Sequence, residues 1–505
     1  MVETELKFQI EPARRDAVRR AVVGPGSSAQ TLRLRARYFD TPDGRLAAAG
    51  LALRLRSEGR GRWVQTLKGR GDGLMRRLEH ELVLPAGVPA ALDVRRHDGT
   101  PAGAALKAAL GPHGADLVER FATDIRRTRR VVRAKSATGE MAAIELAYDE
   151  GWIHATRSDG PQRRAVAEVE FELRSGPPQA LLALASRWVQ RHGLWLDVRS
   201  KAECGHGLAV GVPSAAALAQ APLIARRMTP ARALAAMVQA ALAQVLPNLA
   251  ALAEAGPAGP EHLHQLRVGL RRLRTALREF GAGVQAVDAV WPAALAQLFS
   301  TLGTLRDRDV IAHTLSAPRA AAQRAGLGLS AALSPLRHSA SLTAQDTAVL
   351  RASGLHQLLL ALIGLTQACE QTDRGTPLID VARKRLTRLH KTVTADAAHF
   401  GVLDDAARHV LRKRLKRLRY SLDFVAPLFA AKAVTRYLAL LKPAQEALGD
   451  YNDVVVAEAA CLAAGTHSNG DAFVLGWLNA QRDALSANAA ARLKALSAAP
   501  RFWKA

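Results

Sequence analysis

The sequence predicts an α+β protein, with an antiparallel β-domain over residues 1–210 and an all-α domain over residues 225–500. Three observations support this prediction. Apolar and polar residues alternate in many short segments of the first 200 residues, as is typical of strands. After residue 214 the chain becomes rich in Ala and Leu with short breaks, as is typical of helices. The helical part also contains an internal repeat with an offset of about 145 residues, which predicts duplication of a unit of about four helices.

The β-domain begins with the alternating segment 1–10, and further alternating segments follow it. Turn signals such as Thr41-Pro-Asp-Gly44 and Pro85-Ala-Gly87 separate them. Many strands with few helices predict an antiparallel sheet, either open or closed on itself. We expect the other strands at 32–39, 51–56, 63–68, 77–84, 125–133, 141–148, 151–156 and 165–173, and helices at 11–20, 101–110 and 179–192.

Two of these strands carry acidic residues at alternating positions. Glu3, Glu5 and Lys7 alternate in the first strand, and Glu168-Val-Glu-Phe-Glu172 places three carboxylates on one face of the last. Like charges on one face repel each other, and a divalent cation would relieve this because hard cations prefer carboxylate oxygens. Basic strands lie between the acidic ones. The pattern predicts a site for a metal and a polyanion, most simply Mg²⁺ and a phosphate chain.

Nearly every strand has one charged face and one mostly apolar face. If the charged faces point outward, the domain is a small sheet packed on helices; if they point inward, it is a barrel with a wet, charged tunnel. The density of Arg together with Glu favours the inward arrangement. The positions concerned are Arg33, Arg35, Arg37, Arg54, Arg56, Thr66, Lys68, Arg77, Glu79, Glu81, Arg127 and Arg129.

The composition points to a polyanionic partner. The 505 residues include 70 Lys and Arg against 45 Asp and Glu, a net charge of +25. Aromatic residues make up only 5%, which offers little for base stacking and argues against specific nucleic-acid recognition. Three widely separated cysteines indicate neither a disulfide framework nor a zinc motif. We expect no signal peptide, no membrane span and a cytoplasmic location.

The internal repeat places a row of cations on each of two helices. The segment 264–274 aligns with 409–419, and 302–307 aligns with 448–453. At 100° per residue the cations of each helix share one face, beside a leucine stripe that would anchor the helix. A linear polyanion lying along the helix would meet these cations in turn, whereas an idle solvated face is disfavoured because arginines four residues apart repel. The rows are His264, Arg267, Arg271, Arg274 and Arg278 in the first repeat, and His409, Arg412, Lys416 and Arg419 in the second.

Short polar groups follow a Leu-Gly pair in both repeats. Asp307 and Asp309 lie in the first repeat, and Asn452 and Asp453 lie in the second. We expect these side chains to pair with the arginine rows or to cap helices.

These motifs, taken in order, resemble two known families. Residues 1–205 resemble the CYTH domain of the triphosphate tunnel metalloenzyme superfamily, and residues 225–500 resemble the CHAD domain. The first resemblance is carried by Glu3-Thr-Glu-Leu-Lys7, Tyr38-Phe-Asp-Thr-Pro42, Arg54 with Arg56, Thr66-Leu-Lys68, Asp149, the 168–172 strand and Ser200-Lys201. The second is carried by the segments 264–274, 302–309, 409–420 and 448–453.

The resemblance implies a structure and a set of ligands. It implies an eight-stranded antiparallel tunnel that binds a triphosphate with Mg²⁺ or Mn²⁺, followed by two four-helix bundles (225–370 and 375–500) with affinity for inorganic polyphosphate. The metal carboxylates would be Glu3, Glu5, Glu168 and Glu170, with Glu172, Asp149 and Glu145 as further candidates. The phosphate contacts would be Lys7, Arg35, Arg37, Arg54, Arg56, Lys68, Arg127, Arg129 and Lys201. The two cationic rows would hold the polyphosphate.

The activity expected from this resemblance is hydrolysis of inorganic triphosphate to pyrophosphate and phosphate. Glu5 or Glu170 would orient the attacking water, and Lys7 would act beside them. Three alternatives stay open: hydrolysis of a nucleoside or thiamine triphosphate, adenylate cyclisation, and a non-catalytic protein that binds or localises to polyphosphate. Association with polyphosphate granules would fit the expected cytoplasmic location.

Overall fold

The computed structural model describes residues 2–25, 28–59, 61–71, 73–85, 90–111, 116–212, 215–254, 259–333, 343–369 and 376–504, without the side chains of residues 2, 70 and 304–309. The chain forms two compact units. The first contains Met1–Leu218, Leu242–Leu266 and Thr347–Gln367, and the second contains Ala219–Ala241, Arg267–Asp346 and Ala368–Ala505. The whole β-domain therefore shares its unit with parts of the helical region.

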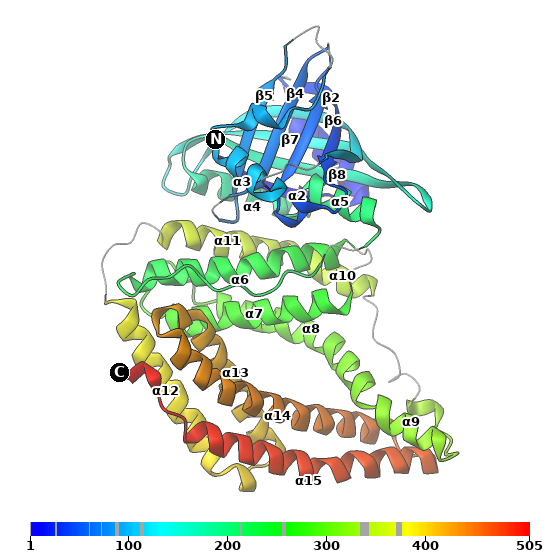
Figure 1. Ribbon diagram of the computed structural model, residues 1–505, viewed down its shortest axis with the longest axis vertical. Coiled ribbons are helices and arrows are strands. Elements are labelled where there is room, and N and C mark those ends of the chain that lie inside the picture. Colours follow the sequence, from blue (N-terminus) through cyan, green and yellow to red (C-terminus); the bar gives the residue numbers. More distant parts are fainter. Residues whose placement is uncertain are drawn as a thin grey trace. The chain divides into compact units, whose positions relative to one another are not determined.

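The β-domain is a closed barrel of eight antiparallel strands (Figure 1). The order is β5-β4-β3-β2-β6-β7-β8-β1, and β1 also pairs with β5, which closes the sheet. A short strand β9 pairs with the end of β1. This confirms the expected eight-stranded barrel. The strands are β1 (Val2–Gln9), β2 (Gln30–Asp40), β3 (Ala52–Ser57), β4 (Trp63–Arg70), β5 (Arg76–Val83), β6 (Val118–Lys135), β7 (Met141–Arg157), β8 (Gly160–Ser175) and β9 (Trp195–Leu196).

The segments 141–148 and 151–156, expected as two strands, form the single strand β7. Gly151 allows this continuity, because a Cβ at this position would lie 2.1 Å from the carbonyl oxygen of Asp124 on β6. A glycine within a strand often marks such a close approach of two backbones rather than a break.

Helices cover apolar patches on the outer face of the barrel. Leu53 and Leu67 pack against α2 (Arg45–Ala48) and α3 (Pro101–Leu110). Phe171 of β8 packs edge-on against Trp188 of α4 (Pro178–His192), with ring centroids 5.4 Å apart. The helix α1 (Arg15–Val23) covers β6 and β7. With apolar side chains buried outside, most charged side chains of these strands face the interior, as expected.

One helix packs inside the barrel. The helix α5 (Lys201–Val210) contacts β6, β7 and β8, and its Ala202 and Leu208 join an inner apolar cluster with Leu34 and Ile125. The interior is therefore apolar around α5 and charged elsewhere.

Both predicted leucine stripes of the helical region are buried: Leu266, Leu270, Leu273 and Leu277 on α7, and Leu411, Leu415, Leu418 and Leu422 on α13. In the second unit α12, α13, α14 and α15 pack as a ring of four, while α8 and α9 pack on α14 and α15. The helices are α6 (Pro230–Ala253), α7 (Pro260–Phe280), α8 (Trp291–Thr314), α9 (Ser316–Arg324), α10 (Ala344–Arg351), α11 (Ser353–Cys369), α12 (Leu378–Ala398), α13 (Asp405–Val425), α14 (Ala431–Ala464) and α15 (Asn469–Ser497). Short 3-10 helices lie at Pro12–Arg14, Val94–His97, Phe400–Val402, Ala426–Leu428 and Phe502–Lys504.

Two helical stretches of the described chain are long and apolar enough to cross a membrane by length and composition alone. They are Pro230–Ala253, with 72% of its most apolar window buried, and Ala344–Cys369, with 44% buried. Core helices pass the same test, so this is weak support for a span.

Candidate functional site

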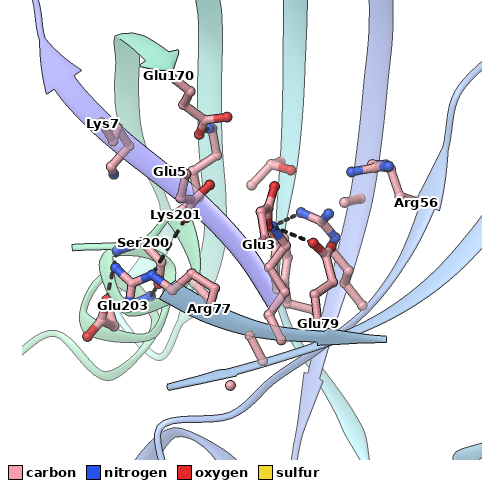
Figure 2. A pocket seen from close by; sticks show the side chains of 18 of the residues that line it. Glu3, Glu5, Lys7, Arg56, Arg77, Glu79, Glu170, Ser200, Lys201 and Glu203 are labelled. Carbon is pink, nitrogen blue, oxygen red and sulfur yellow. Dashed lines mark hydrogen bonds and ion pairs between the residues drawn. The ribbon is translucent and has the colours of Figure 1, made fainter. Parts of the chain in front are cut away.

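The barrel encloses a cavity of about 1290 Å³ lined by charges of both signs (Figure 2). Figure 2 shows Glu3, Glu5 and Glu170 in this cavity, with Lys7, Lys201 and Arg56 around them. The predicted site residues that line it are Glu3, Glu5, Lys7, Arg54, Arg56, Lys68, Arg127, Arg129, Glu145, Asp149, Glu170, Glu172 and Lys201. Glu168 is buried beside the cavity in ion pairs with Lys7 and Lys201.

The prediction for Arg35 and Arg37 was wrong, because both lie on the outer face of β2. The Arg35 side chain is 61% exposed and lies 3.3 Å from Asp124, and Arg37 lies 3.8 Å from Glu119. The prediction that β2 has one charged and one apolar face is correct, but the apolar face points inward and packs against α5. The sequence pattern of one strand does not reveal which of its faces a distant helix will cover.

Tyr38, on the inner face of β2, was not predicted as a site residue. Its hydroxyl oxygen accepts a hydrogen bond from Arg54 at 3.3 Å, and its ring stacks on Phe121 with centroids 4.5 Å apart. Burial alone would raise the pKa of Tyr38, but the neighbouring Arg54 lowers it below its ordinary value. Two features of the sequence could have pointed to Tyr38 as a site residue: it belongs to the Tyr38–Pro42 motif, and it lies on the face of β2 opposite the arginines.

Carboxylates lie opposite one another across three neighbouring strands. The register sets Glu5 of β1 opposite Glu172 of β8, and Glu172 opposite Glu145 of β7. Arg174 contacts Glu172 at 2.7 Å and Glu145 at 2.8 Å. Burial and the nearby Glu3 still raise the pKa of Glu172 to about 8. This row therefore holds more negative charge than its neighbours balance.

A second carboxylate cluster is neutralised by the protein itself. Oxygens of Asp149, Glu168 and Glu170 lie within 4.8 Å of one another. Lys201 Nζ lies 2.6 Å from Asp149 and 2.8 Å from Glu170, and Arg127 contacts the same two residues at 2.6 Å and 2.5 Å. Burial opposes ionisation, but Lys201 and Arg127 hold the pKa of Glu170 well below its ordinary value.

Lys201 is placed by the start of α5. The Ser200 hydroxyl accepts a hydrogen bond from the Glu203 backbone N–H at 3.1 Å, and the Glu203 carboxylate accepts one from the Ser200 N–H at 2.7 Å. This capping box fixes the first turn of the helix, so the lysine points into the carboxylate cluster.

The side chains present fit both a divalent cation and an anion. The row Glu5, Glu172 and Glu145, with Glu3 beside it, offers oxygen donors that the nearby cations balance only in part. Lys68 lies 2.8 Å from Glu3 and Arg77 lies 3.6 Å from Glu5, but burial still raises the pKa of both carboxyls. On the other wall, the buried Nε–H groups of Arg54 and Arg56 have no hydrogen-bond partner among the described residues. Buried donors without partners are costly, and an anionic ligand would satisfy them.

The helical rows gather cations on α7 and α13. The guanidinium groups of Arg267, Arg271 and Arg274 lie 4.7, 4.9 and 5.7 Å from the centre of the Phe299 ring. Burial, together with Arg271 and Arg412, lowers the pKa of Lys416 to about 6. At the C-terminal end of each row an arginine lies near a carboxylate: Arg278 is 3.8 Å from Glu279, and Arg419 is 3.7 Å from Asp423. At the other end of the first row, His264 belongs to the first compact unit, whereas the arginines of that row belong to the second.

The polar groups after Leu448-Gly449 pair with the second row as expected. His409 Nδ1 lies 2.6 Å from the Asn452 side-chain oxygen, and Arg412 lies 3.6 Å from Asp453. The corresponding Asp307 and Asp309 side chains lie outside the described residues.

Comparison with protein families agrees with this architecture. Residues 1–203 match the CYTH domain and residues 236–462 match the CHAD domain. The chain carries a CYTH domain followed by a CHAD domain. The barrel cavity lies in the CYTH domain, and the cationic rows lie in the CHAD domain.

Individual relatives cover parts of the chain. An inorganic triphosphatase from Haemophilus influenzae is 31% identical over 184 residues, which are 35% of this chain and 46% of that protein. The chain thus spans about half the length of this curated relative. The crystal structure of a CHAD domain from Ricinus communis is 26% identical, covers 57% of this chain and 99% of its own, and has a TM-score of 0.46. A putative adenylyl cyclase from Hippeastrum is described as having a dominant triphosphatase activity. It is 16% identical, covers 42% of this chain and 97% of its own, and has a TM-score of 0.27.

Proposed function

We propose that the CYTH barrel hydrolyses inorganic triphosphate to pyrophosphate and phosphate with Mg²⁺ or Mn²⁺, and that the CHAD domain binds inorganic polyphosphate. The observation that carries the first part is one cavity with half-buried arginines on one wall and partly balanced carboxylates on another. The 31% identity to an inorganic triphosphatase over 184 residues supports the choice of substrate.

The phosphates would bind to cations on rigid strands. Phosphoryl transfer depends on positioning and charge neutralisation more than on covalent chemistry, and fixed Arg and Lys side chains supply both. Burial would lower the pKa of Lys7, but Glu168 and Asp197 raise it, so this lysine stays charged. The proposed phosphate ligands are Lys7, Arg54, Arg56, Lys68, Arg127, Arg129 and Lys201.

The metal would be held by the carboxylate row of Glu5, Glu172 and Glu145, with Glu3 beside it. When bound, a divalent cation neutralises charge on phosphate oxygens and lowers the pKa of a bound water. Glu5 and Glu170 would orient the attacking water. Asp149, Glu168 and Glu170, also implied as metal ligands by the family resemblance, are already paired with Lys201 and would hold that lysine in place.

The substitution Glu5→Gln tests the role of the carboxylate row. It removes one charged ligand with little change in shape, so we expect triphosphate turnover to fall by about 100-fold or more. The melting temperature should stay near that of the wild type, because the change also relieves repulsion. Glu150→Gln, on an exposed carboxylate of β7, is the matched control. Metal-dependent turnover retained in Glu5→Gln would remove this residue from the mechanism.

Polyphosphate binding is supported by the concentration of cations on α7 and α13. Neutralising Arg271 and Arg412 to Gln should weaken binding of long-chain polyphosphate by about tenfold or more and flatten its salt dependence. Replacing the exposed Arg492 and Lys494 of α15 by Gln makes the same change in net charge and should alter affinity by less than about twofold. Equal loss in both variants would mean that net charge, and not the rows, binds the polymer.

A further inference from the structure

The segment 195–201 lies between the tunnel cations and helices of the CHAD domain, all within the first compact unit. On the tunnel side, the backbone oxygen of Arg199 accepts a hydrogen bond from Lys7 Nζ, and that of Val198 accepts one from Arg77 at 2.8 Å. Lys201 ends the segment in the carboxylate cluster. Three cations that line the cavity therefore depend on where this short segment lies.

On the helical side, the end of α6 holds the Arg199 side chain. The guanidinium lies 2.8 Å from the carboxylate of Glu254 and donates to the backbone oxygen of Ala250 at 3.1 Å. The other oxygen of Glu254 lies 2.5 Å from Arg164 of β8. Glu254 thus joins the segment, the barrel wall and α6.

Two further contacts hold the same segment from α10 and α11. The Leu196 backbone N–H donates to Nδ1 of the buried His356 at 3.1 Å, and His356 Nε2 lies 2.9 Å from the backbone oxygen of Leu350. The Arg351 guanidinium lies 4.4 Å from the centre of the Trp195 ring and donates to the Ala253 oxygen at 2.7 Å. The CHAD helices therefore hold the segment at Trp195, Leu196 and Arg199.

A buried polar chain links the helical side to the tunnel. Asp197 is fully buried and lies 2.8 Å from Arg199, and it accepts a hydrogen bond from Gln9 at 3.3 Å. Gln9 also donates to Glu168 at 3.1 Å, and Glu168 lies 3.1 Å from Lys7. Because each group is paired with the next in a site of low dielectric, a shift of Arg199 changes the surroundings of Lys7.

We propose that Glu254 and Arg199 are positioning residues for the tunnel, and that the helices of the CHAD domain hold the segment 195–201 so that Lys7 and Lys201 meet the substrate phosphates. The kinetic part of this inference rests on the proposed function. The CHAD domain then serves the barrel as a structural support, in addition to any polymer that it binds.

The kinetic test compares Glu254→Gln, Glu254→Asp and Glu458→Gln in the full chain with triphosphate and Mg²⁺. Glu458 is the control because it is a helical carboxylate of the second compact unit, paired with Arg482 at 2.7 Å. We expect kcat/KM to fall about five- to tenfold in Glu254→Gln, mainly through KM, and to recover at least half of that loss in Glu254→Asp. Values within twofold of wild type in Glu254→Gln, or an equal loss in Glu458→Gln, would overturn the inference.

Amide hydrogen exchange tests the same inference without relying on activity. The N–H groups of Leu196, Asp197 and Arg199 are bonded to His356, Lys7 and Asp197. Their exchange should be about fivefold faster or more in Glu254→Gln than in wild type, and unchanged in Glu458→Gln. Unchanged exchange in Glu254→Gln would refute the positioning role. Faster exchange in a chain that cleaves no triphosphate would instead refute the proposed function and leave the structural role standing.

Discussion

At the scale of single residues, the cavity is built from charges that the protein balances unevenly. Asp149, Glu168 and Glu170 are closely paired with Lys201 and Arg127, whereas Glu172 keeps a pKa of about 8. Because carboxylates at full charge repel across adjacent strands, the unbalanced row is where an added cation lowers the energy most.

Lys416 is a residue of the second cationic row whose charge state is shifted mainly by burial. Burial, with Arg271 and Arg412 nearby, lowers its pKa from 10.5 to about 6. Between these pH values the unfolded chain binds a proton that the folded chain lacks. Stability therefore rises with pH across this interval, and the full penalty of charging Lys416 is present below about pH 6.

Replacing Lys416 by Met should therefore stabilise the protein more at low pH than at high pH. We expect the melting temperature of Lys416→Met to exceed that of wild type by about 2–4 °C at pH 6 and by less at pH 9. Lys413→Met, at an exposed position of the same helix, should show no such difference. Thermal melts at both pH values check this, and a shift that is equal at both would mean that Lys416 does not titrate in this interval.

At the scale of elements, two neighbouring strands of similar sequence direct their arginines to opposite sides of the barrel wall. Both β2 and β3 alternate leucine with arginine, but Arg54 and Arg56 of β3 line the cavity while Arg35 and Arg37 of β2 face outward. Periodicity predicted that both are strands with one charged face. It did not predict the inner face of β2, because that depends on α5, which lies more than 160 residues further along the chain.

A matched pair of substitutions separates these two strands. Arg56→Gln should lower kcat/KM for triphosphate by about 100-fold, because a buried cation that faces the substrate is lost. Arg35→Gln removes the same charge from the outer face and should leave kcat/KM within about twofold of wild type. Steady-state kinetics of both variants at one metal concentration test this prediction. An equal loss of kcat/KM in the two variants would contradict the outward orientation of Arg35.

At the scale of the whole molecule, one basic chain carries two different places for polyanions. The barrel offers a cavity with both signs of charge, and the helical region offers cationic rows on α7 and α13. The net charge of +25 predicted a polyanionic partner but not its place. The barrel, the helical repeat and most cavity residues followed from alternation, duplication and family resemblance.

The support of segment 195–201 by CHAD helices could not be predicted from the sequence. It depends on contacts between residues far apart in the chain, such as Arg199 with Glu254 and Leu196 with His356. None of these residues belongs to a repeating pattern in the sequence that would link it to its partner. Only the folded arrangement shows that they belong together.

The most direct test of the central claim is phosphate release from inorganic triphosphate, ATP and long-chain polyphosphate, each with Mg²⁺, with Mn²⁺ and with EDTA. The proposed function predicts fast release from triphosphate that requires the metal, little release from ATP, and binding of polyphosphate without rapid cleavage. Release that persists in EDTA, faster turnover of ATP than of triphosphate, or no release from any substrate would contradict it.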